Sequence, residues 1–314
     1  MRNLTALFVV ALALMAPSCN RETPQADDKK TVALVLKTLN HPFFVDMRRG
    51  AQEAADRLGV NLQVQAAERE IDVDKQMQIV ENMLQTGIDA LVITPSGSRE
   101  IVSALVKAKA ANVPILIVDT RLDAKAAADA GVVAQTFIGS DNYEGGKLAG
   151  DYVVTATGGK ARVGILEGIP GHETGDSRLR GFRDAVSKSP GITIVASQPA
   201  NWERDQGFNV FQNMLQAHPN IDTVFAASDL MALGAIEAIA AAGKTGKIRV
   251  VGFDALDDAK KAIAAGTMDA SVAQFPYEMG KAAVESAVKV LAGEKLPADI
   301  MVKLEMITKA SGSR

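Results

Sequence analysis

Residues 31–44 of the sequence read TVALVLKTLNHPFF, and this stretch decides the fold. Positions 32–36 are continuously apolar, which predicts a strand buried on both faces of a parallel sheet. Polar and aromatic residues follow at 37–44, and Pro42 keeps the residue before it out of the helical conformation. A helical pattern comes next. Ligands bind beyond the carboxyl ends of the strands in open parallel sheets, so this loop is predicted to face a binding site.

Short apolar runs alternate with segments of helical period from residue 31 onward, a pattern typical of βαβ units. A first series of predicted strands covers residues 31–37, 61–65, 90–94, 114–118 and 136–138. A second series covers residues 162–166, 193–197, 223–226, 248–252 and 270–273. Helices are predicted between them, with a long helical pattern at 278–291 and a last apolar run at 300–304. The predicted fold class is α/β, with two Rossmann-like lobes built on parallel sheets.

The two series of strands resemble each other in sequence. The dipeptide RG at 49–50 recurs at 180–181, and the tetrapeptide NMLQ at 82–85 recurs at 213–216. Both pairs are 131 residues apart. Equal spacing at two distant points indicates that one unit was duplicated.

Asp119 and Asp254 hold corresponding places in the two halves, each at the end of a predicted strand. A lone Asp at such a place is commonly a helix cap or a turn former. A related pair, one from each half, is better explained by a cleft that both lobes share.

The composition describes a globular protein long enough for two lobes with their own cores. The 314 residues are 47% hydrophobic and 23% charged, with a formal net charge of -3. Without a strong basic bias, nucleic acid is not an expected partner. The single cysteine excludes a disulfide within the chain.

Residues 1–19 are predicted to be an export signal, because Arg2 precedes an apolar run at 4–15 that is too short to span a bilayer. Cys19 follows this run, in the place where bacterial lipoproteins carry the cysteine that is acylated. We expect lipidation of Cys19; the alternative is an ordinary cleaved signal with an incidental cysteine. Residues 20–30 are polar and are expected to form a flexible linker.

The predicted strand ends gather charged, polar and aromatic side chains that suit a neutral polyhydroxylated molecule. A carboxylate accepts the proton of a hydroxyl while an arginine donates to its oxygen, and each such bond contributes about 1.5–3 kcal/mol. Aromatic rings cover the C–H faces of a sugar, although one of the adjacent phenylalanines could instead staple the helix start. The predicted ligand-binding residues are Lys37, His41, Phe43, Phe44, Thr94, Asp119, Arg121, Arg178, Trp202, Ser228, Asp254 and Gln274.

Sequence signatures of catalysis and of cofactor binding are missing. There is no G-x-S-x-G elbow, no G-x-G-x-x-G after a strand and no complete phosphate-binding loop, and the three histidines have no metal-ligand spacing. We therefore predict a binding protein with no cofactor and no metal. A cleft enzyme that uses a carboxylate pair is the alternative, because one fold hosts many chemistries.

Five segments resemble the periplasmic ribose-binding proteins and their relatives, the substrate-binding subunits of bacterial sugar ABC importers. These segments are TLNHPFF at 38–44, GSDNYEGGK at 139–147, SQPA at 197–200 before Trp202, DLMALGA at 229–235 and VGFD at 251–254. The resemblance extends over nearly all of residues 31–304.

The resemblance implies a type I periplasmic binding protein fold, with two lobes joined by a hinge of three crossings near residues 140, 274 and 301. It assigns to the N-terminal lobe residues 31–139 and 275–301, and to the C-terminal lobe residues 140–274 and 302–310. Phe43 and Phe44 would stack on one face of a sugar and Trp202 on the other. The hydroxyl-binding positions that keep the residue type expected for ribose are Asp119, Arg178, Asp254 and Gln274.

The resemblance further implies a monomeric periplasmic protein that closes on a sugar or polyol and delivers it to an inner-membrane ABC permease. A ligand-binding module for chemotaxis, which would contact a chemoreceptor, is the alternative. Sugar-responsive repressors share the fold but carry a helix-turn-helix headpiece where this sequence has an export signal.

Departures from the ribose pattern occur at Lys37, His41, Thr94, Thr120 and Ser228. Ribose binders carry Ser, Asn, Asn, Arg and Asn at these places, in that order, and here Arg121 comes one place after the expected arginine. A cleft built to pair particular hydroxyls rejects analogues by up to about 10⁴–10⁵. We therefore expect a different pentose, a hexose or a sugar alcohol.

Overall fold

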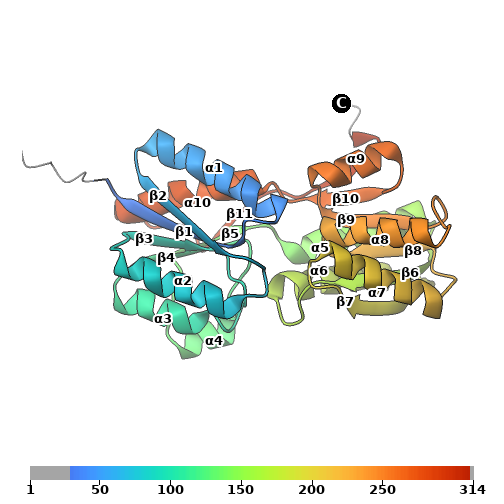
Figure 1. Ribbon diagram of the computed structural model, residues 1–314, viewed down its shortest axis with the longest axis horizontal. Coiled ribbons are helices and arrows are strands. Elements are labelled where there is room, and N and C mark those ends of the chain that lie inside the picture. The colour runs from blue at the N-terminus through green and yellow to red at the C-terminus, as the bar shows by residue number, and fades with distance from the viewer. Residues whose placement is uncertain (1–28, 312–314) are drawn as a thin grey trace, which may run out of the picture.

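The stretch at 31–44 forms a strand, β1 (Thr31–Thr38), that leads into a helix, α1 (Pro42–Leu58). The computed structural model describes residues 29–311 and places them in two lobes, side by side along the long axis (Figure 1). The five residues at 32–36 are all 0% exposed, as expected for a strand covered on both faces. The predicted α/β class is confirmed.

The N-terminal lobe is built on one parallel sheet. Its other strands are β2 (Asn61–Ala67), β3 (Ala90–Ile93), β4 (Ile115–Val118), β5 (Thr136–Gly139) and β11 (Asp299–Met301). They lie in the order β11-β5-β4-β3-β1-β2. Helices α1 and α10 (Pro276–Leu291) cover one face (Figure 1). The other face is covered by α2 (Val73–Gln85) and α3 (Val102–Ala110), next to the short α4 (Ala124–Asp129).

The C-terminal lobe repeats this plan. Its sheet contains β6 (Lys160–Glu167), β7 (Gly191–Pro199), β8 (Thr223–Ala226), β9 (Arg249–Asp254), β10 (Ala270–Ala273) and β12 (Glu305–Thr308). The order is β12-β10-β9-β8-β6-β7, and only β12 pairs antiparallel. Its helices are α5 (Asn142–Ala156) and α6 (Glu173–Val186), which pack together, α7 (Arg204–Ala217) and α8 (Asp229–Ala241), which form a second pair, and α9 (Asp257–Ala265).

The chain passes between the lobes three times. It leaves β5 for α5 at 140–141, leaves β10 for α10 at 274–275, and joins β11 to β12 through 302–304. The last apolar run of the sequence, 300–304, is therefore not one element. Its first two residues end β11, which pairs with β5, and residues 302–304 lead into β12, which pairs with β10. The segment 299–308 therefore adds an edge strand to each lobe.

The repeated RG dipeptide marks the same helix contact in both lobes. A Cβ atom on Gly50 of α1 would overlap the backbone oxygen of Tyr277 in α10. In the C-terminal lobe, a Cβ on Gly181 of α6 would overlap the backbone oxygen of Tyr143 in α5. Only glycine lets two helix backbones come this close, which explains why the duplicated units both keep it.

Gly50→Ala is expected to lower the free energy of unfolding by about 1–3 kcal/mol, because the added methyl group overpacks a contact between two backbones. Chemical denaturation measures the change. Arg48→Ala, at an exposed position of the same helix, is the control and should shift stability by less than about 0.5 kcal/mol. An unchanged midpoint for Gly50→Ala would show that the two helices do not touch as described.

Candidate functional site

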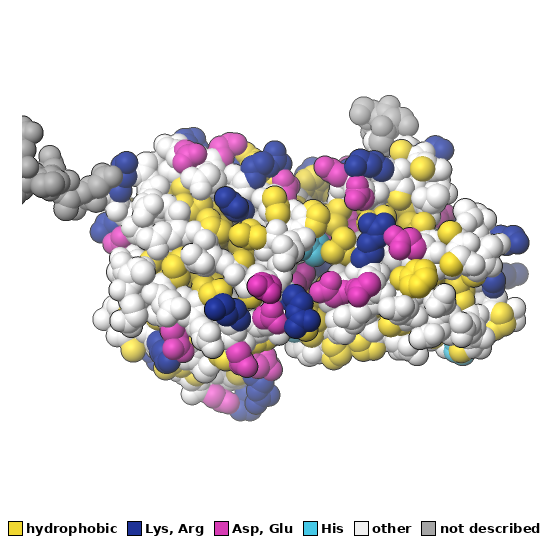
Figure 2. Space-filling model, in the orientation of Figure 1, with side chains coloured by type: hydrophobic (Ala, Val, Ile, Leu, Met, Phe, Trp, Pro, Cys, Tyr) yellow, Lys and Arg dark blue, Asp and Glu magenta, His cyan; other side chains and the backbone are white. Residues whose placement is uncertain are grey.

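The carboxyl ends of the strands in both sheets point toward the junction of the two lobes, where a buried cavity lies. It has about 320 Å³ of empty space when its openings are counted. Figure 2 shows the surface above the junction, with acidic and basic side chains along the seam. The cavity is lined by Lys37, His41, Phe43, Phe44, Glu70, Asp119, Thr174, Arg178, Trp202, Ser228, Asp254 and Gln274.

Ten of the twelve predicted ligand-binding residues line this one cavity; the exceptions are Thr94 and Arg121. Thr94 is buried at the end of β3, with its Oγ1 3.7 Å from the sulfur of Met47. It is therefore buried but does not line the cavity. The prediction that the ten contact a ligand stays a prediction.

Arg121 points away from the cavity. Its guanidinium forms an ion pair with Asp299 at 2.7 Å and lies 3.7 Å from the ring centre of Phe137. The chain turns sharply at Asp119, with φ of 63°, so Thr120 points inward and the next residue outward. Arg121 therefore does not take the place of the arginine that ribose binders carry at the position of Thr120.

Two lining residues, Glu70 and Thr174, are absent from the predicted set. Glu70 follows β2, which continues to Ala67, whereas the predicted strand ended at residue 65. With the shorter strand, Glu70 was too far from the strand end to be included among the expected site residues. Thr174 lies 131 residues after Phe43, the spacing of the internal repeat, and both stand in the first turn of a helix. The repeat could have identified Thr174.

His41 caps α1 and is held in one tautomer. Its Nδ1 accepts a hydrogen bond from the backbone N–H of Phe43 at 3.1 Å, so the ring proton is on Nε2. Burial, and next the charge of Lys37, lower the pKa of His41 to about 4. At neutral pH the ring is therefore uncharged and offers one N–H donor.

Lys37 lies between two carboxylates of the N-terminal lobe. Its Nζ is 3.5 Å from Glu70 Oε2 and 3.8 Å from Asp119 Oδ2, and all three residues are at least 93% buried. The ammonium group also lies 5.7 Å from the ring centre of Phe44. Burial raises the pKa of Glu70, against the opposing effect of Lys37.

Arg178 organises the C-terminal side. Its Nη1 donates to the backbone oxygen of Ala227 at 2.7 Å, its Nε donates to Asn142 at 2.9 Å, and Nη1 lies 3.7 Å from Asp254. Gln274, in a hinge crossing, donates from Nε2 to the same Asp254 oxygen at 2.6 Å. Burial outweighs both partners and raises the pKa of Asp254 to about 7.

Three polar atoms of the cavity residues are buried without a hydrogen-bond partner among the described residues. They are Trp202 Nε1, Ser228 Oγ and Gln274 Oε1. Leaving such a group unpaired costs about 1–3 kcal/mol, so the fold retains these groups at an energetic disadvantage. Trp202 Nε1 is a donor, Gln274 Oε1 is an acceptor and Ser228 Oγ can be either. A ligand with hydroxyl groups could bond to all three atoms.

The backbone is strained at three of the residues that line the cavity. Asp119, Trp202 and Asp254 have φ of 63°, 67° and 114°, in the left-handed region that residues with a Cβ avoid. Such conformations cost about 1–3 kcal/mol each and concentrate at functional sites. Asp119 and Asp254, the corresponding acids of the two halves, thus share both a position and an unusual backbone geometry.

Polar contacts join the two lobes beside the cavity. Thr174 of α6 donates to Thr120 Oγ1 at 3.2 Å, and Thr120 donates to Asp119 at 3.0 Å. The N–H of Glu173 donates to Ser98 Oγ at 3.3 Å. The contacts made by Thr174 and by Glu173 cross from one lobe to the other, so the structure shows the lobes closed.

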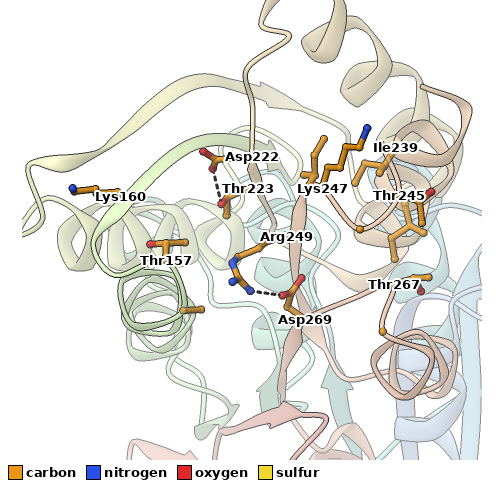
Figure 3. Close-up of a pocket in the computed structure, with 15 residues that line it drawn as sticks. Thr157, Lys160, Asp222, Thr223, Ile239, Thr245, Lys247, Arg249, Thr267 and Asp269 are labelled. Atoms are coloured by element: carbon orange, nitrogen blue, oxygen red, sulfur yellow. Dashed lines mark hydrogen bonds and ion pairs between the residues drawn. The ribbon is translucent and has the colours of Figure 1, made fainter. Parts of the chain in front are cut away.

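A larger hollow, with about 1070 Å³ of empty space when its openings are counted, lies at the opposite end of the C-terminal lobe (Figure 3). Its walls come from the starts of β8, β9 and β10 rather than their carboxyl ends. Arg249 pairs with Asp269 at 2.8 Å and Thr223 donates to Asp222 at 2.9 Å, so much of its polar surface is already satisfied. The junction cavity, despite its smaller volume, carries the unpaired groups and is the candidate site.

Residues 29–311 contain no group of three or more His, Cys, Asp or Glu side chains arranged to hold a metal ion. Within the same part of the chain, no helix has the length and apolar character needed to cross a bilayer. Cys19, the predicted lipidation site, and the predicted export signal lie outside the described residues.

Comparisons with known proteins agree with this architecture. The chain is 40% identical over 304 residues to the ribose import binding protein RbsB of Escherichia coli (strain K12), covering 97% of this chain and 98% of that one. It is 34% identical over 284 residues, with 88% and 91% covered, to the D-allose-binding periplasmic protein of the same organism.

Among solved structures, an ABC transporter periplasmic solute binding protein from Actinobacillus succinogenes 130z with bound D-allose superposes with a TM-score of 0.85. That protein is 39% identical, and the match covers 91% of this chain and 99% of that one. Residues 32–295 match the family described as a periplasmic binding protein domain. The chain therefore belongs to the periplasmic binding protein domain family.

Proposed function

We propose that this protein captures one neutral sugar or polyol between its lobes and delivers it to an inner-membrane ABC permease. The observation that carries the proposal is a buried cavity at the junction, with three unpaired polar atoms and an acid from each duplicated half. Relatives whose names state ribose or D-allose binding support it.

The charges of the cavity favour a neutral ligand. Lys37 and Arg178 supply two positive charges, while Glu70, Asp119 and Asp254 supply three carboxyl groups. The raised pKa values of Glu70 and Asp254 mean that these acids resist ionisation, so the charges come close to balance. A charged ligand would disturb that balance in a site with little water to screen it. The hydroxyl groups of a neutral ligand can bond to both the donors and the acceptors of the cavity without changing its net charge.

The binding event is proposed to be a closure of the lobes. The lining residues come from both lobes and from the hinge crossing at Gln274, so a ligand makes its full set of contacts only in the closed form. A ligand that binds one state better shifts the population toward it. Closure would be a hinge motion that brings the two lobes together around the ligand. It would also present to the permease a surface formed by both lobes.

A panel of ligands tests the proposal. Polyols, pentoses, hexoses, amino acids and inorganic phosphate would each be added in a thermal-shift assay, and hits titrated by calorimetry. At least one polyhydroxylated compound is expected to raise the Tm and to bind with a stoichiometry of one. Stabilisation by amino acids or phosphate alone would contradict the proposal.

The affinity is expected to fall as the pH drops from about 8 to about 6, by up to about tenfold per unit below the pKa of Asp254. Protonation at a pKa of about 7 removes a charged acceptor, whereas His41, with a pKa of about 4, stays neutral throughout. Calorimetry across this range, with Asp254→Asn as the control, measures the effect. An affinity that does not change with pH in the unsubstituted protein would count against Asp254 as an acceptor.

The effect of Asp254 on folding has the opposite sign. Its pKa lies above the unfolded value of about 3.8, so the folded state binds the proton more tightly. Its contribution to stability is therefore complete below about pH 3.8 and is lost as the pH rises to about 7. Ligand affinity and the stability of the free protein are expected to move in opposite directions over the upper part of this range.

We propose a periplasmic monomer that is tethered through a lipid on Cys19. Radiolabelled palmitate should label the full chain and should not label Cys19→Ser. Labelling that persists in the variant would remove Cys19 as the anchor, and absence of labelling in both would favour an ordinary cleaved signal. A role in chemotaxis stays a prediction.

A further inference from the structure

His172 and His41 hold corresponding places in the two lobes but bond differently. They are 131 residues apart, the spacing of the internal repeat, and each stands at the N-terminal cap of its helix, α6 or α1. Nδ1 of His41 accepts a hydrogen bond from the helix that it caps. His172 makes no such bond to α6, and its Nδ1 is buried without a partner among the described residues. The ring of His172 therefore does not serve as a helix cap.

His172 lies where the two lobes meet. The next residue, Glu173, donates its N–H to Ser98 of the N-terminal lobe at 3.3 Å. The residue after that, Thr174, donates to Thr120 of the same lobe at 3.2 Å. The start of α6 is thus part of the boundary that closure of the lobes buries.

Groups of the N-terminal lobe act on the ring across this boundary. His172 is only 5% exposed. The positive charge of Lys37 and the backbone of Ser96 both affect its pKa, and both belong to the N-terminal lobe. Ser96 Oγ is also buried without a hydrogen-bond partner in the described part of the chain. Opening the lobes would therefore separate the ring from these groups and expose it to water.

A charged ring would have an unpaired N–H in the closed form. A neutral imidazole carries a proton on one nitrogen and a charged imidazole carries one on each. Because Nδ1 of His172 has no partner among residues 29–311, its N–H would be an unsatisfied donor on a buried cation. Burial, and next the positive charge of Lys37, lower the pKa of His172 to about 3. The closed form therefore keeps this ring neutral well below pH 6.

The surrounding charges do not offset this effect. Among the described residues, Lys37 is the charged group that shifts the pKa of His172, and no carboxylate forms an ion pair with the ring. The charged groups on the neighbouring elements are Lys37 on β1, Glu70 after β2, Arg99 and Glu100 after β3, Asp119 after β4, and Glu173 and Asp176 on α6.

We propose that His172 is a pH-sensitive switch of lobe closure: the closed form excludes a second ring proton, so acidification favours the open form and release of the bound sugar or polyol. In the open form, water surrounds the ring, which then takes up a proton near pH 6.5 as an ordinary histidine does. Closure must release that proton. The inference rests on the proposed function, capture by closure of the lobes, and adds a means by which the same site is regulated.

The direction and size of the effect follow from the released proton. Below the pKa of the open form, release of one proton on binding lowers the affinity by up to tenfold per pH unit. A pKa of His172 near 6.5 when open and about 3 when closed gives a loss of about tenfold between pH 7.5 and pH 5.5. This loss adds to that expected from Asp254, so a variant of His172 is needed to separate the two.

His172→Gln tests the switch, because glutamine keeps a polar side chain and cannot take up a proton in this range. The probe is the compound that raises the Tm most at pH 7.5 in the ligand panel, which includes D-ribose, D-allose, D-arabinose and myo-inositol. By calorimetry between pH 7.5 and pH 5.5, the unsubstituted protein is expected to lose about tenfold more affinity than His172→Gln. His218→Gln, at the end of α7, is the control and should keep the full loss.

An NMR titration of the His172 ring measures the same step without a substitution. Without the probe compound, the ring is expected to titrate near pH 6.5. With the probe compound bound, it should stay neutral down to about pH 4.5. A ring that titrates at the same pH in both states overturns the inference, and this result can be obtained even if His172→Gln does not fold.

The outcomes separate this inference from the proposed function. If the probe compound binds and the pH profiles of the unsubstituted protein and His172→Gln coincide, the switch is overturned and the proposed function stands. If no compound of the panel binds, the proposed function fails, and the switch fails with it.

Discussion

Asp254→Asn is expected to weaken ligand binding by about 10²–10⁴-fold while the protein stays folded. A hydrogen bond to a charged acceptor contributes about 1.5–3 kcal/mol, and two such bonds to hydroxyl groups correspond to that range. The amide keeps the shape of the side chain and an oxygen that can accept from Gln274, which now bonds the carboxylate at 2.6 Å. Calorimetry measures the affinity, and circular dichroism with thermal unfolding verifies the fold.

The matched control is Asp258→Asn, at an exposed acid of α9 close in sequence to the site. It should change affinity by less than twofold. If Asp254→Asn binds as tightly as the unsubstituted protein, the ligand does not use the acid of the C-terminal lobe, and the symmetrical role of the two acids fails with it.

Arg178→Met is expected to lower the free energy of unfolding by about 3–5 kcal/mol and to abolish detectable binding. Removing one partner of a buried ion pair leaves the other charge uncompensated. Here the substitution also leaves acceptors on Asn142 and Ala227 without their donor. The loss should be smaller at pH 6 than at pH 8, because the carboxyl group of Asp254 escapes part of the penalty by taking up a proton.

A double-mutant cycle measures how much of this loss comes from the pair. Arg178→Met/Asp254→Asn is expected to be more stable than Arg178→Met, since the uncompensated charge is gone. Arg180→Met, at an exposed arginine of the same helix, is the control and should have little effect. Additive losses from the two single substitutions would show that Arg178 and Asp254 do not interact, contrary to their distance of 3.7 Å.

The sequence predicts much of this fold because parallel strands buried on both faces leave a strong pattern. The run at 32–36 and its counterparts mark the strands, and the rule that ligands bind at strand carboxyl ends then selects the cavity residues. The internal repeat adds a second, independent line of reasoning. It pairs Asp119 with Asp254, which the structure places on one cavity.

The sequence does not show where a loop side chain points. Arg121 was expected in the site because it follows the acid of the first lobe, yet the left-handed turn at Asp119 directs it to Asp299 instead. Thr94 follows the carboxyl end of β3, but its hydroxyl contacts Met47 and the residue does not line the cavity. Predicting Glu70 as a site residue requires knowing where β2 ends. That boundary is set by pairing with β1 rather than by the local sequence pattern.

The protein carries one tryptophan, and Trp202 lines the cavity at 5% exposure, so its fluorescence tests ligand capture in the cleft most directly. Titrating the compound that binds in calorimetry should change the emission in a saturable way, with a midpoint equal to the calorimetric Kd. Asp254→Asn should show no change at the same concentrations. Calorimetric binding with unchanged tryptophan emission would place the ligand outside the cleft and contradict the account.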